Sequence, residues 1–231
     1  MSMEGDHGSS SHWIPLADLM TGLMMVFMLL TAAFMLRVEQ TTTLVVKEYE
    51  ETKSDLLRAL QKEFAQDLKQ WNAELLGDMT IRFNDPTVLF ATGSSELRPQ
   101  FKLVLKEFFP RYVRLITSEK YRTAIKEVRI EGHTSSFWAA GMDAQSAYFR
   151  NMELSQARTR SALQFVLTLP AVTDNEDWLI QHVTANGLSS SRPLTKDRSE
   201  RAEVVNQRVE FRIVSNAGDR LDQIANELRQ N

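Results

Sequence analysis

The sequence of 231 residues contains no cysteine, which excludes disulfide bonds and thiolate metal sites. The 27 lysines and arginines do not outnumber the 30 acidic residues, so the net charge of −3 does not indicate a nucleic-acid-binding face. No nucleophile stands with a base in the pattern of a hydrolase, and His133 has no second histidine or cysteine at ligand spacing. We therefore predict neither an enzyme nor a metal centre, and no cofactor.

Charged residues are also nearly absent from a long stretch near the N-terminus. The apolar run Trp13–Leu36 holds one carboxylate, Asp18, and no lysine or arginine. As a helix, its 24 residues would extend roughly 36 Å, enough to cross a hydrocarbon core of roughly 30 Å. The tail before it, residues 1–12, has no basic residue, and the run is longer than the core of a signal peptide. We therefore expect a retained transmembrane helix over residues 13–36.

Asp18 lies about one turn inside this span. An ionised carboxylate is costly in a membrane, so the default interpretation is a residue on an ion or proton pathway. The structural alternative is that Asp18 caps a helix that begins at Leu19. Thr21 follows one turn later, where its hydroxyl can bond the carboxyl or the backbone, and Gly22 leaves room for a neighbouring helix.

Glycine and proline are absent from Arg37 to Leu76, and Gly77 follows. Apolar residues recur at helical steps within this stretch: Tyr49, Leu56, Leu60, Phe64, Leu68, Trp71 and Leu75. We therefore predict a helical connector over residues 37–77, ended by Gly77. Its stripe resembles a coiled-coil seam, so it is expected either to form a parallel dimer or to fold back on its own domain or on a partner protein.

The pattern changes to mixed strands and helices over residues 78–214, which predicts an α+β sandwich. We expect strands at Met79–Phe83, Glu127–Gly132, Leu179–Ala185 and Arg208–Val214, and helices at Arg98–Ile116 and Tyr148–Leu169. Pro110 should kink or break the first of these helices. The tail, residues 215–231, is expected to form a short docked helix with Leu221, Ile224, Ala225 and Leu228 on one face.

Several motifs in this domain resemble the peptidoglycan-binding domain shared by OmpA, Pal and MotB. They are Leu89-Phe90-x-x-Gly93 with Leu97, Ile130-Glu131-Gly132-His133-Thr134, Asn151-x-x-Leu154-Ser155-x-x-Arg158, Asn186-Gly187-Leu188 with Pro193, and Asn206-Gln207-Arg208-Val209-Glu210-Phe211. The resemblance covers roughly residues 80–214, with boundaries good to about ±2–4 residues. It implies an α/β sandwich that binds the diaminopimelate of the cell-wall stem peptide.

The resemblance also implies which residues bind the wall. Arg158 matches the arginine that holds the carboxylate; the other matched positions are Thr134, Ser135, Asn151, Leu154 and Arg208. Arg158 and Arg208 could instead have purely structural roles, and Leu154 could belong to the core. Ser135 departs from the family, which has an aspartate there to hold the ammonium group. Asp143, later in the same loop, is one possible replacement.

The span carries a second resemblance, because Ala17-Asp18-Leu19-Met20-Thr21 is similar to the A-D-F-M-T segment of MotB-type stator subunits. It implies that Asp18, assisted by Thr21, carries the translocated ion, which we expect to be a proton. It also implies a homodimer of this chain inside a ring of a MotA-like, multi-span partner.

The implied location is the bacterial inner membrane, with the N-terminus cytoplasmic and the C-terminal domain periplasmic. The positive-inside rule points weakly the other way, because Arg37 and Lys47 follow the span and no basic residue precedes it. We give precedence to the resemblance.

Among stator subunits, the chain most resembles ZorB proteins of Zorya anti-phage systems, since a basic N-terminal tail and the usual aspartate of the wall site are both absent. A flagellar MotB-type subunit and a plain wall-tethering anchor of the OmpA family remain as alternatives. A TolR- or ExbD-like energiser would share the membrane aspartate but lack the Asn151–Arg158 motif.

Overall fold

The computed structural model describes residues 13–195, 197, 199–220, 223 and 226. The chain divides into two compact units, one formed by residues 1–48 with 220–231 and the other by residues 49–219. The expected N-terminal tail and the four apolar positions of the expected tail helix lie outside the described residues.

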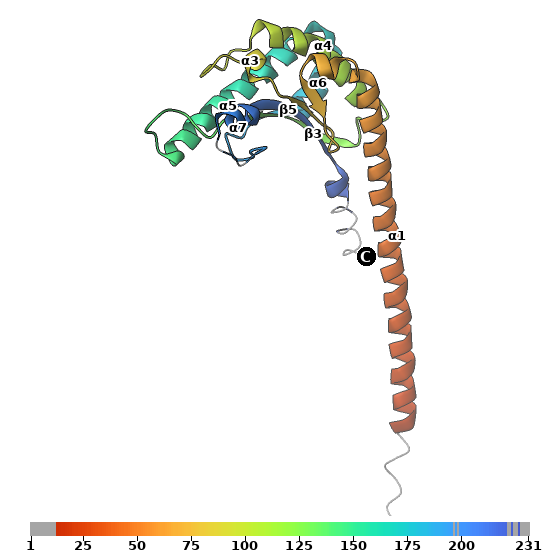
Figure 1. The fold of residues 1–231 in the computed structure, drawn as a ribbon. Coiled ribbons are helices and arrows are strands. Elements are labelled where there is room, and N and C mark those ends of the chain that lie inside the picture. Colours follow the sequence, from red (N-terminus) through yellow and green to blue (C-terminus); the bar gives the residue numbers. More distant parts are fainter. Residues whose placement is uncertain (1–12, 196, 198, 221–222, 224–225, 227–231) are drawn as a thin grey trace, which may run out of the picture. The chain divides into compact units, whose positions relative to one another are not determined.

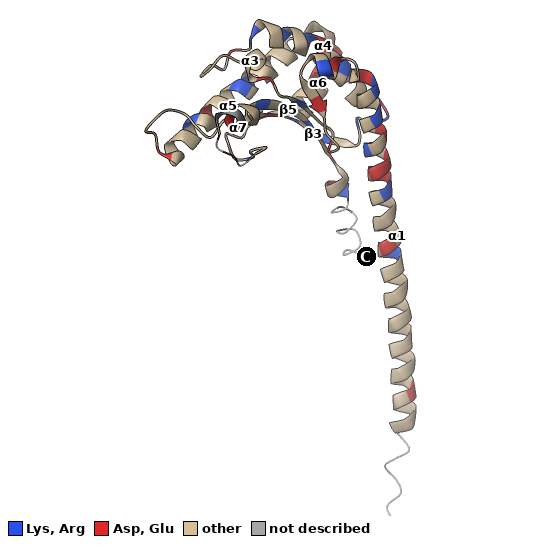
Figure 2. Ribbon diagram, viewed as in Figure 1, with Lys and Arg blue, Asp and Glu red and all other residues tan. Residues whose placement is uncertain are grey.

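The first unit contains most of α1, the helix Trp13–Phe64. Every side chain from Trp13 to Leu36 is exposed, and within the described residues α1 is the single helix that is long and apolar enough to cross a membrane. Figure 2 shows this segment free of charge apart from one acidic position. Since α1 begins at Trp13, Asp18 lies inside the helix, and the alternative in which it caps a helix from Leu19 is wrong.

The second unit begins at Tyr49, so the last turns of α1 belong to it. Leu56, Leu60 and Phe64 are buried in its core, together with Leu68 and Trp71. The apolar stripe of the connector therefore packs on its own domain, which was one of the expected alternatives.

The prediction of a helical connector that continues to Leu76 is wrong. In the structure, α1 ends at Phe64. It is followed by the short helix α2, Asp67–Gln70, and the strand β1, Ala73–Leu75. The chain turns here because Trp71 packs against Phe64 and Phe108, with ring centroids 6.0 and 6.1 Å apart.

Five strands form one sheet in the order β1-β2-β5-β3-β4. Its neighbouring strands β5 and β3 are labelled in Figure 1. β2 is Thr80–Phe83, β3 Ile125–His133, β4 Val183–Gly187 and β5 Arg208–Ser215. β3 and β4 are parallel, and the other neighbouring strands are antiparallel. The predicted α+β sandwich is confirmed.

The helices of this unit are α3, Pro86–Leu89, α4, Pro99–Ile116, α5, Ala144–Leu167, the 3₁₀ helix η1, Pro170–Asn175, α6, Glu176–His182, and α7, Glu200–Asn206. α4 continues through Pro110 and is not broken by it. The apolar residues around this proline, Phe108, Phe109, Tyr112 and Val113, are buried, and tertiary packing of this kind can offset the hydrogen bond that the proline removes.

The strand predicted at Leu179–Ala185 is wrong in its first half, where α6 extends to His182. Short apolar runs do not distinguish a strand from a buried helix. The acidic residues Glu176 and Asp177 in the first turn favour the helix, because they complement its dipole.

The two faces of the sheet differ. Val209, Phe211 and Ile213 of β5 point to the side covered by α4 and α5, where Phe211 packs against Phe108 at 5.1 Å. The residues between them point to the opposite face, which is polar. The pocket described next lies beyond the ends of β3 and β4, beside α5.

Candidate functional site

Five of the six predicted wall-binding residues line one pocket of about 1190 Å³ in the second unit. They are Thr134, Ser135, Asn151, Leu154 and Arg158. The sixth, Arg208, is not among its lining residues. Apolar side chains, including Phe137 and Trp138, also contribute, so the pocket combines a few polar groups with apolar walls.

Two elements position these residues. The loop that leaves β3 after His133 carries Thr134 and Ser135, and α5 carries Asn151, Leu154 and Arg158 at spacings of three and four, which place them on one helix face. α5 lies close to β4 because Gly187 has no side chain: a Cβ there would be 2.2 Å from the backbone nitrogen of Gln156.

Arg158 is the main charged group of the pocket. It is 8% exposed, its Nε donates to the carbonyl oxygen of Ser94 at 2.9 Å, and its Nη2 donates to that of Ala91 at 3.2 Å. The guanidinium carbon lies 4.9 Å from the ring centre of Phe90. Burial lowers the pKa of Arg158 to about 10, so the group remains charged near neutral pH.

No carboxylate within the described ranges forms an ion pair with Arg158. Of its five N–H donors, the two bonds above use two, and the other three have no hydrogen-bond partner among the residues that the structure describes. A buried cation without a counter-ion is costly, so an anionic ligand would be bound favourably here.

Thr134 offers a second unused group. Its backbone N–H donates to the carbonyl oxygen of Ser189 at 3.0 Å, but its hydroxyl is buried and has no partner among the residues that the structure describes. Ser135 and Asn151 both donate to the carbonyl oxygen of Phe137, at 3.0 and 3.2 Å. These two residues therefore hold the loop in place, while the hydroxyl of Thr134 is available.

Among the lining residues that sequence reasoning missed, Glu203 of α7 is the acidic one. Its carboxylate accepts from the backbone nitrogen of Ser136 at 2.6 Å and also from the Ser136 hydroxyl. Asp143, the replacement considered for the missing acid, instead caps α5 by accepting from the backbone nitrogen of Ser146 at 2.9 Å. Hydrogen bonds from Ser146 lower the pKa of Asp143.

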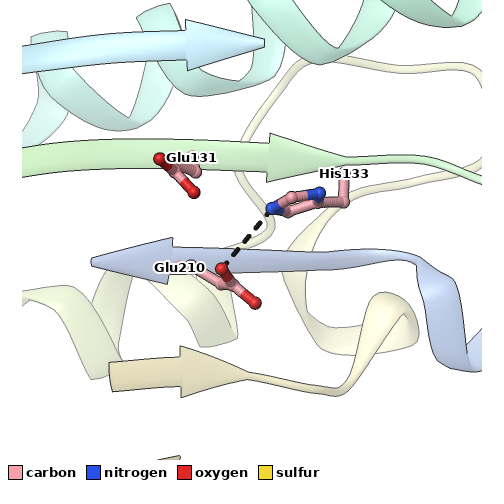
Figure 3. A group of neighbouring side chains, drawn as sticks. All are labelled: Glu131, His133 and Glu210. Carbon is pink, nitrogen blue, oxygen red and sulfur yellow. Dashed lines mark ion pairs between the residues drawn. The ribbon is translucent and has the colours of Figure 1, made fainter. Parts of the chain in front are cut away.

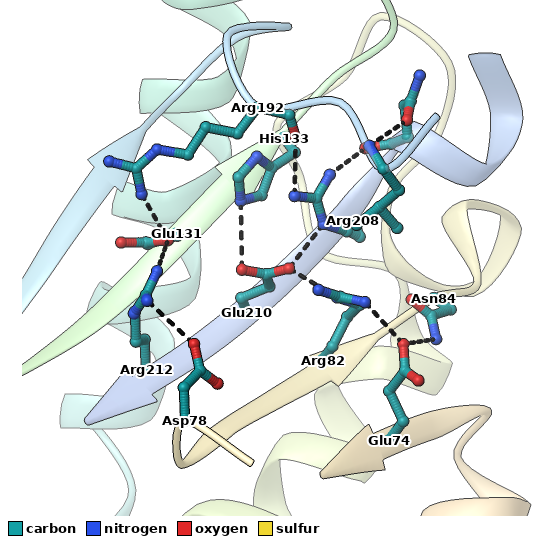
Figure 4. Close-up of polar contacts among 12 residues, drawn as sticks. Glu74, Asp78, Arg82, Asn84, Glu131, His133, Arg192, Arg208, Glu210 and Arg212 are labelled. Atoms are coloured by element: carbon teal, nitrogen blue, oxygen red, sulfur yellow. Dashed lines mark hydrogen bonds and ion pairs between the residues drawn. The ribbon is translucent and has the colours of Figure 1, made fainter. Parts of the chain in front are cut away.

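Arg208 has a different environment on the polar face of the sheet (Figure 4). Its Nε donates to Glu210 at 2.7 Å, and its two terminal nitrogens donate to the carbonyl oxygens of Asn206 and Arg192 at 2.9 and 3.0 Å. These bonds favour the structural interpretation of Arg208.

The same face gathers three possible metal ligands, Glu131, His133 and Glu210, with ligand atoms within 4.8 Å of one another (Figure 3). Nε2 of His133 lies 3.5 Å from Glu210. Burial lowers the pKa of His133. Burial alone would raise the pKa of Glu210, but its contacts with His133 and Arg208 lower it.

Arginines balance the charge of this cluster. Four arginines and four carboxylates are linked by ion pairs on the polar face: Arg82, Arg192, Arg208 and Arg212 with Glu74, Asp78, Glu131 and Glu210. A metal ion would have to displace arginines from both Glu131 and Glu210. We interpret the cluster as an ion-pair network that supports the sheet.

In the first unit, Asp18 and Gly22 lie on one face of α1, where they line a groove with Pro15, Leu19, Leu23 and Val26. The hydroxyl of Thr21 donates to the backbone carbonyl oxygens of Ala17 and Asp18 rather than to the Asp18 carboxyl. The sequence allowed the Thr21 hydroxyl to bond either the Asp18 carboxyl or the backbone, and in the structure it bonds the backbone.

The chain combines one helix that is long and apolar enough to cross a membrane with a five-stranded domain of the MotB/OmpA-like fold. The crystal structure of a MotB-like protein from Desulfovibrio vulgaris matches this fold with a TM-score of 0.53 and 22% identity, over 74% of this chain and 99% of that one. No family model matches the sequence.

A curated relative identifies the family. The Zorya protein ZorB of Escherichia coli is 41% identical over 212 residues, which are 90% of this chain and 89% of that protein. The chain belongs to the ZorB family, and the resemblance inferred from its motifs is confirmed.

Proposed function

We propose that this chain is the stator subunit of a proton-driven rotary motor of the inner membrane, anchored to peptidoglycan and acting in Zorya anti-phage defence. The observation that carries the proposal is Arg158, a buried arginine without a carboxylate partner in the described part of the chain, facing a pocket beside the unused hydroxyl of Thr134.

The pocket has the chemistry to bind a carboxylate of the wall stem peptide. The planar fork of Arg158 suits a bidentate contact, and Thr134 can donate a further hydrogen bond. Asn151 and Ser135 fix the loop through Phe137, so the donors are positioned before the ligand arrives. Anchoring of this kind would hold the stator still while its partner turns.

The membrane helix supplies the second half of the proposal. The exposed apolar surface of α1 has to be covered by lipid or by other helices, and Asp18 on it would be covered by protein, because a carboxylate facing lipid is costly. The partner we propose is a MotA-like, ZorA-like ring around a homodimer of this chain. Each proton that Asp18 carries across a membrane potential of 100 mV would supply about 2.3 kcal/mol to turn the partner.

Wall binding is tested by sedimentation of the full chain in detergent with purified sacculi. Arg158→Lys keeps the charge but removes the fork, and we expect it to bind about tenfold more weakly. Arg160→Gln, an exposed arginine of the same helix, is the matched control and should bind as wild type does. Equal binding by Arg158→Lys, or no binding by wild type, would contradict the anchoring role.

Ion transport is tested in vesicles that hold the chain with its multi-span partner. Asp18→Asn keeps the size of the side chain but does not titrate, so proton flux driven by a pH gradient should vanish while the complex still assembles. If the variant conducts like wild type, Asp18 is not the ion carrier, and a plain wall-tethering anchor becomes the better interpretation.

A further inference from the structure

The walls of the pocket carry opposite charges. Arg158 lies on α5, and Glu203 on α7 is the single acidic residue among the lining residues that the structure describes. We propose that Glu203 is a specificity-determining residue that binds the ammonium group of a zwitterionic wall peptide, whose carboxylate is bound by Arg158. This inference rests on the proposed wall-binding function of the pocket.

The carboxylate of Glu203 has acceptor capacity to spare. It offers about four lone-pair sites, and the backbone nitrogen and hydroxyl of Ser136 occupy one on each oxygen. The remaining sites can accept from an ammonium group. The two contacts with Ser136 also fix the carboxylate in one orientation, so little side-chain entropy is lost when a ligand binds.

The other candidates for this role are excluded by their contacts. Ser135 carries no charge, and its hydroxyl is bonded to the carbonyl oxygen of Phe137. Asp143 is committed to the N-terminus of α5 and does not line the pocket. Glu203 of α7 therefore takes the role of the aspartate that the family has at the position of Ser135.

The arrangement defines the ligand by its chemistry. Arg158 has three donors that no described residue uses and that can bind a carboxylate, and Glu203 has acceptor sites for an ammonium beyond those used by Ser136. A diaminopimelate side chain with its distal amine and carboxylate both free offers this pair of groups. A peptide that lacks the amine would keep the contact with Arg158 and lose the contact with Glu203.

The test compares two stem peptides that differ in one group, using calorimetry on the full chain in detergent. One peptide carries diaminopimelate, and the other carries 2-aminopimelate, which keeps the distal carboxylate but has hydrogen in place of the distal amine. Wild type should bind the first at least about tenfold more tightly, as expected for a charge-assisted hydrogen bond. Glu203→Gln should bind both peptides with nearly the same affinity.

Ser136→Ala separates ligand binding from loop support, because it removes the hydroxyl contact of Glu203 and keeps the carboxylate. It should retain the preference for the peptide with the amine. A preference that persists in Glu203→Gln, or that is lost equally in Ser136→Ala, would overturn the inference and leave Glu203 as a support of the loop.

The same experiment distinguishes a failure of the role proposed for Glu203 from a failure of the proposed wall-binding function. Wild type that binds both peptides equally contradicts the role of Glu203 but keeps wall binding through Arg158. Wild type that binds neither peptide contradicts the proposed wall-binding function, and the role of Glu203 with it.

Discussion

Gly187→Ala is expected to disturb the fold and the pocket together. Gly187 ends β4, where α5 crosses the sheet. A Cβ at this position would lie 2.2 Å from the backbone nitrogen and 2.6 Å from the Cα of Gln156. Ordinary contacts begin at 3.4 Å, and backbone cannot rotate out of the way as a flexible side chain does. α5 would therefore have to move away from β4.

The magnitude follows from this overlap. Overpacking of a well-packed site costs about 1–3 kcal/mol, and each kcal/mol lowers the Tm of a domain of this size by about 2–4 °C. We therefore expect the Tm to fall by about 2–12 °C. Because Arg158 lies on the helix that must move, binding to sacculi should weaken as well, which distinguishes this variant from a general loss of stability.

The assay is thermal unfolding of the full chain in detergent, followed by tryptophan fluorescence, which should change on unfolding because Trp71 and Trp178 are buried in the second unit. Gly77→Ala is the matched control, because a Cβ there meets no atom within 4 Å. If Gly187→Ala unfolds within about 1 °C of Gly77→Ala, the close approach of α5 to β4 does not determine the position of α5, and our reasoning about the pocket fails.

Two further predictions concern the core and pH. Phe64→Ala should lower the free energy of unfolding by about 3–5 kcal/mol, and with it the Tm, because this ring is fully buried against Trp71 and Phe108. If the variant instead forms fewer dimers and keeps its Tm, Phe64 belongs to a coiled-coil seam and not to the core. Burial lowers the pKa of His133, so the unfolded chain takes up a proton before the folded one, and the Tm should fall as pH drops below about 6.5. His133→Asn should flatten that dependence, and an unchanged slope would exclude His133 as its source.

The sequence predicted the elements whose pattern is long and regular. The apolar span, β3, β5 and the long helices α4 and α5 all lie where periodicity placed them, within a few residues. Errors occurred where tertiary packing decides, at the end of α1 and at α6. The connector has one continuous helical pattern, yet Leu68 and Trp71 reach the core only after the helix has ended.

The site was predictable in one part and unpredictable in another. Asn151, Leu154 and Arg158 follow from helical spacing within one segment, and the loop with Thr134 was found through its motif. Glu203 could not be found in this way, because it is 67 residues from Ser136 along the chain and meets it only through the tertiary fold. Arg208 matched a motif, but the register of β5 with β3 places it on the polar face, directly opposite His133.

The strict alternation of β5 connects these observations. Val209, Phe211 and Ile213 join the core that α4 and α5 cover, while Arg208, Glu210 and Arg212 fix the opposite face through ion pairs. The loop after β3, which carries Thr134, therefore starts from a strand that is held on both faces. Gly187 then allows α5 to approach this rigid sheet, which brings Arg158 to the same pocket as Thr134. If the proposed wall contact is made through Arg158 and Thr134, these two supports hold its donors on rigid elements of the fold rather than on a mobile loop.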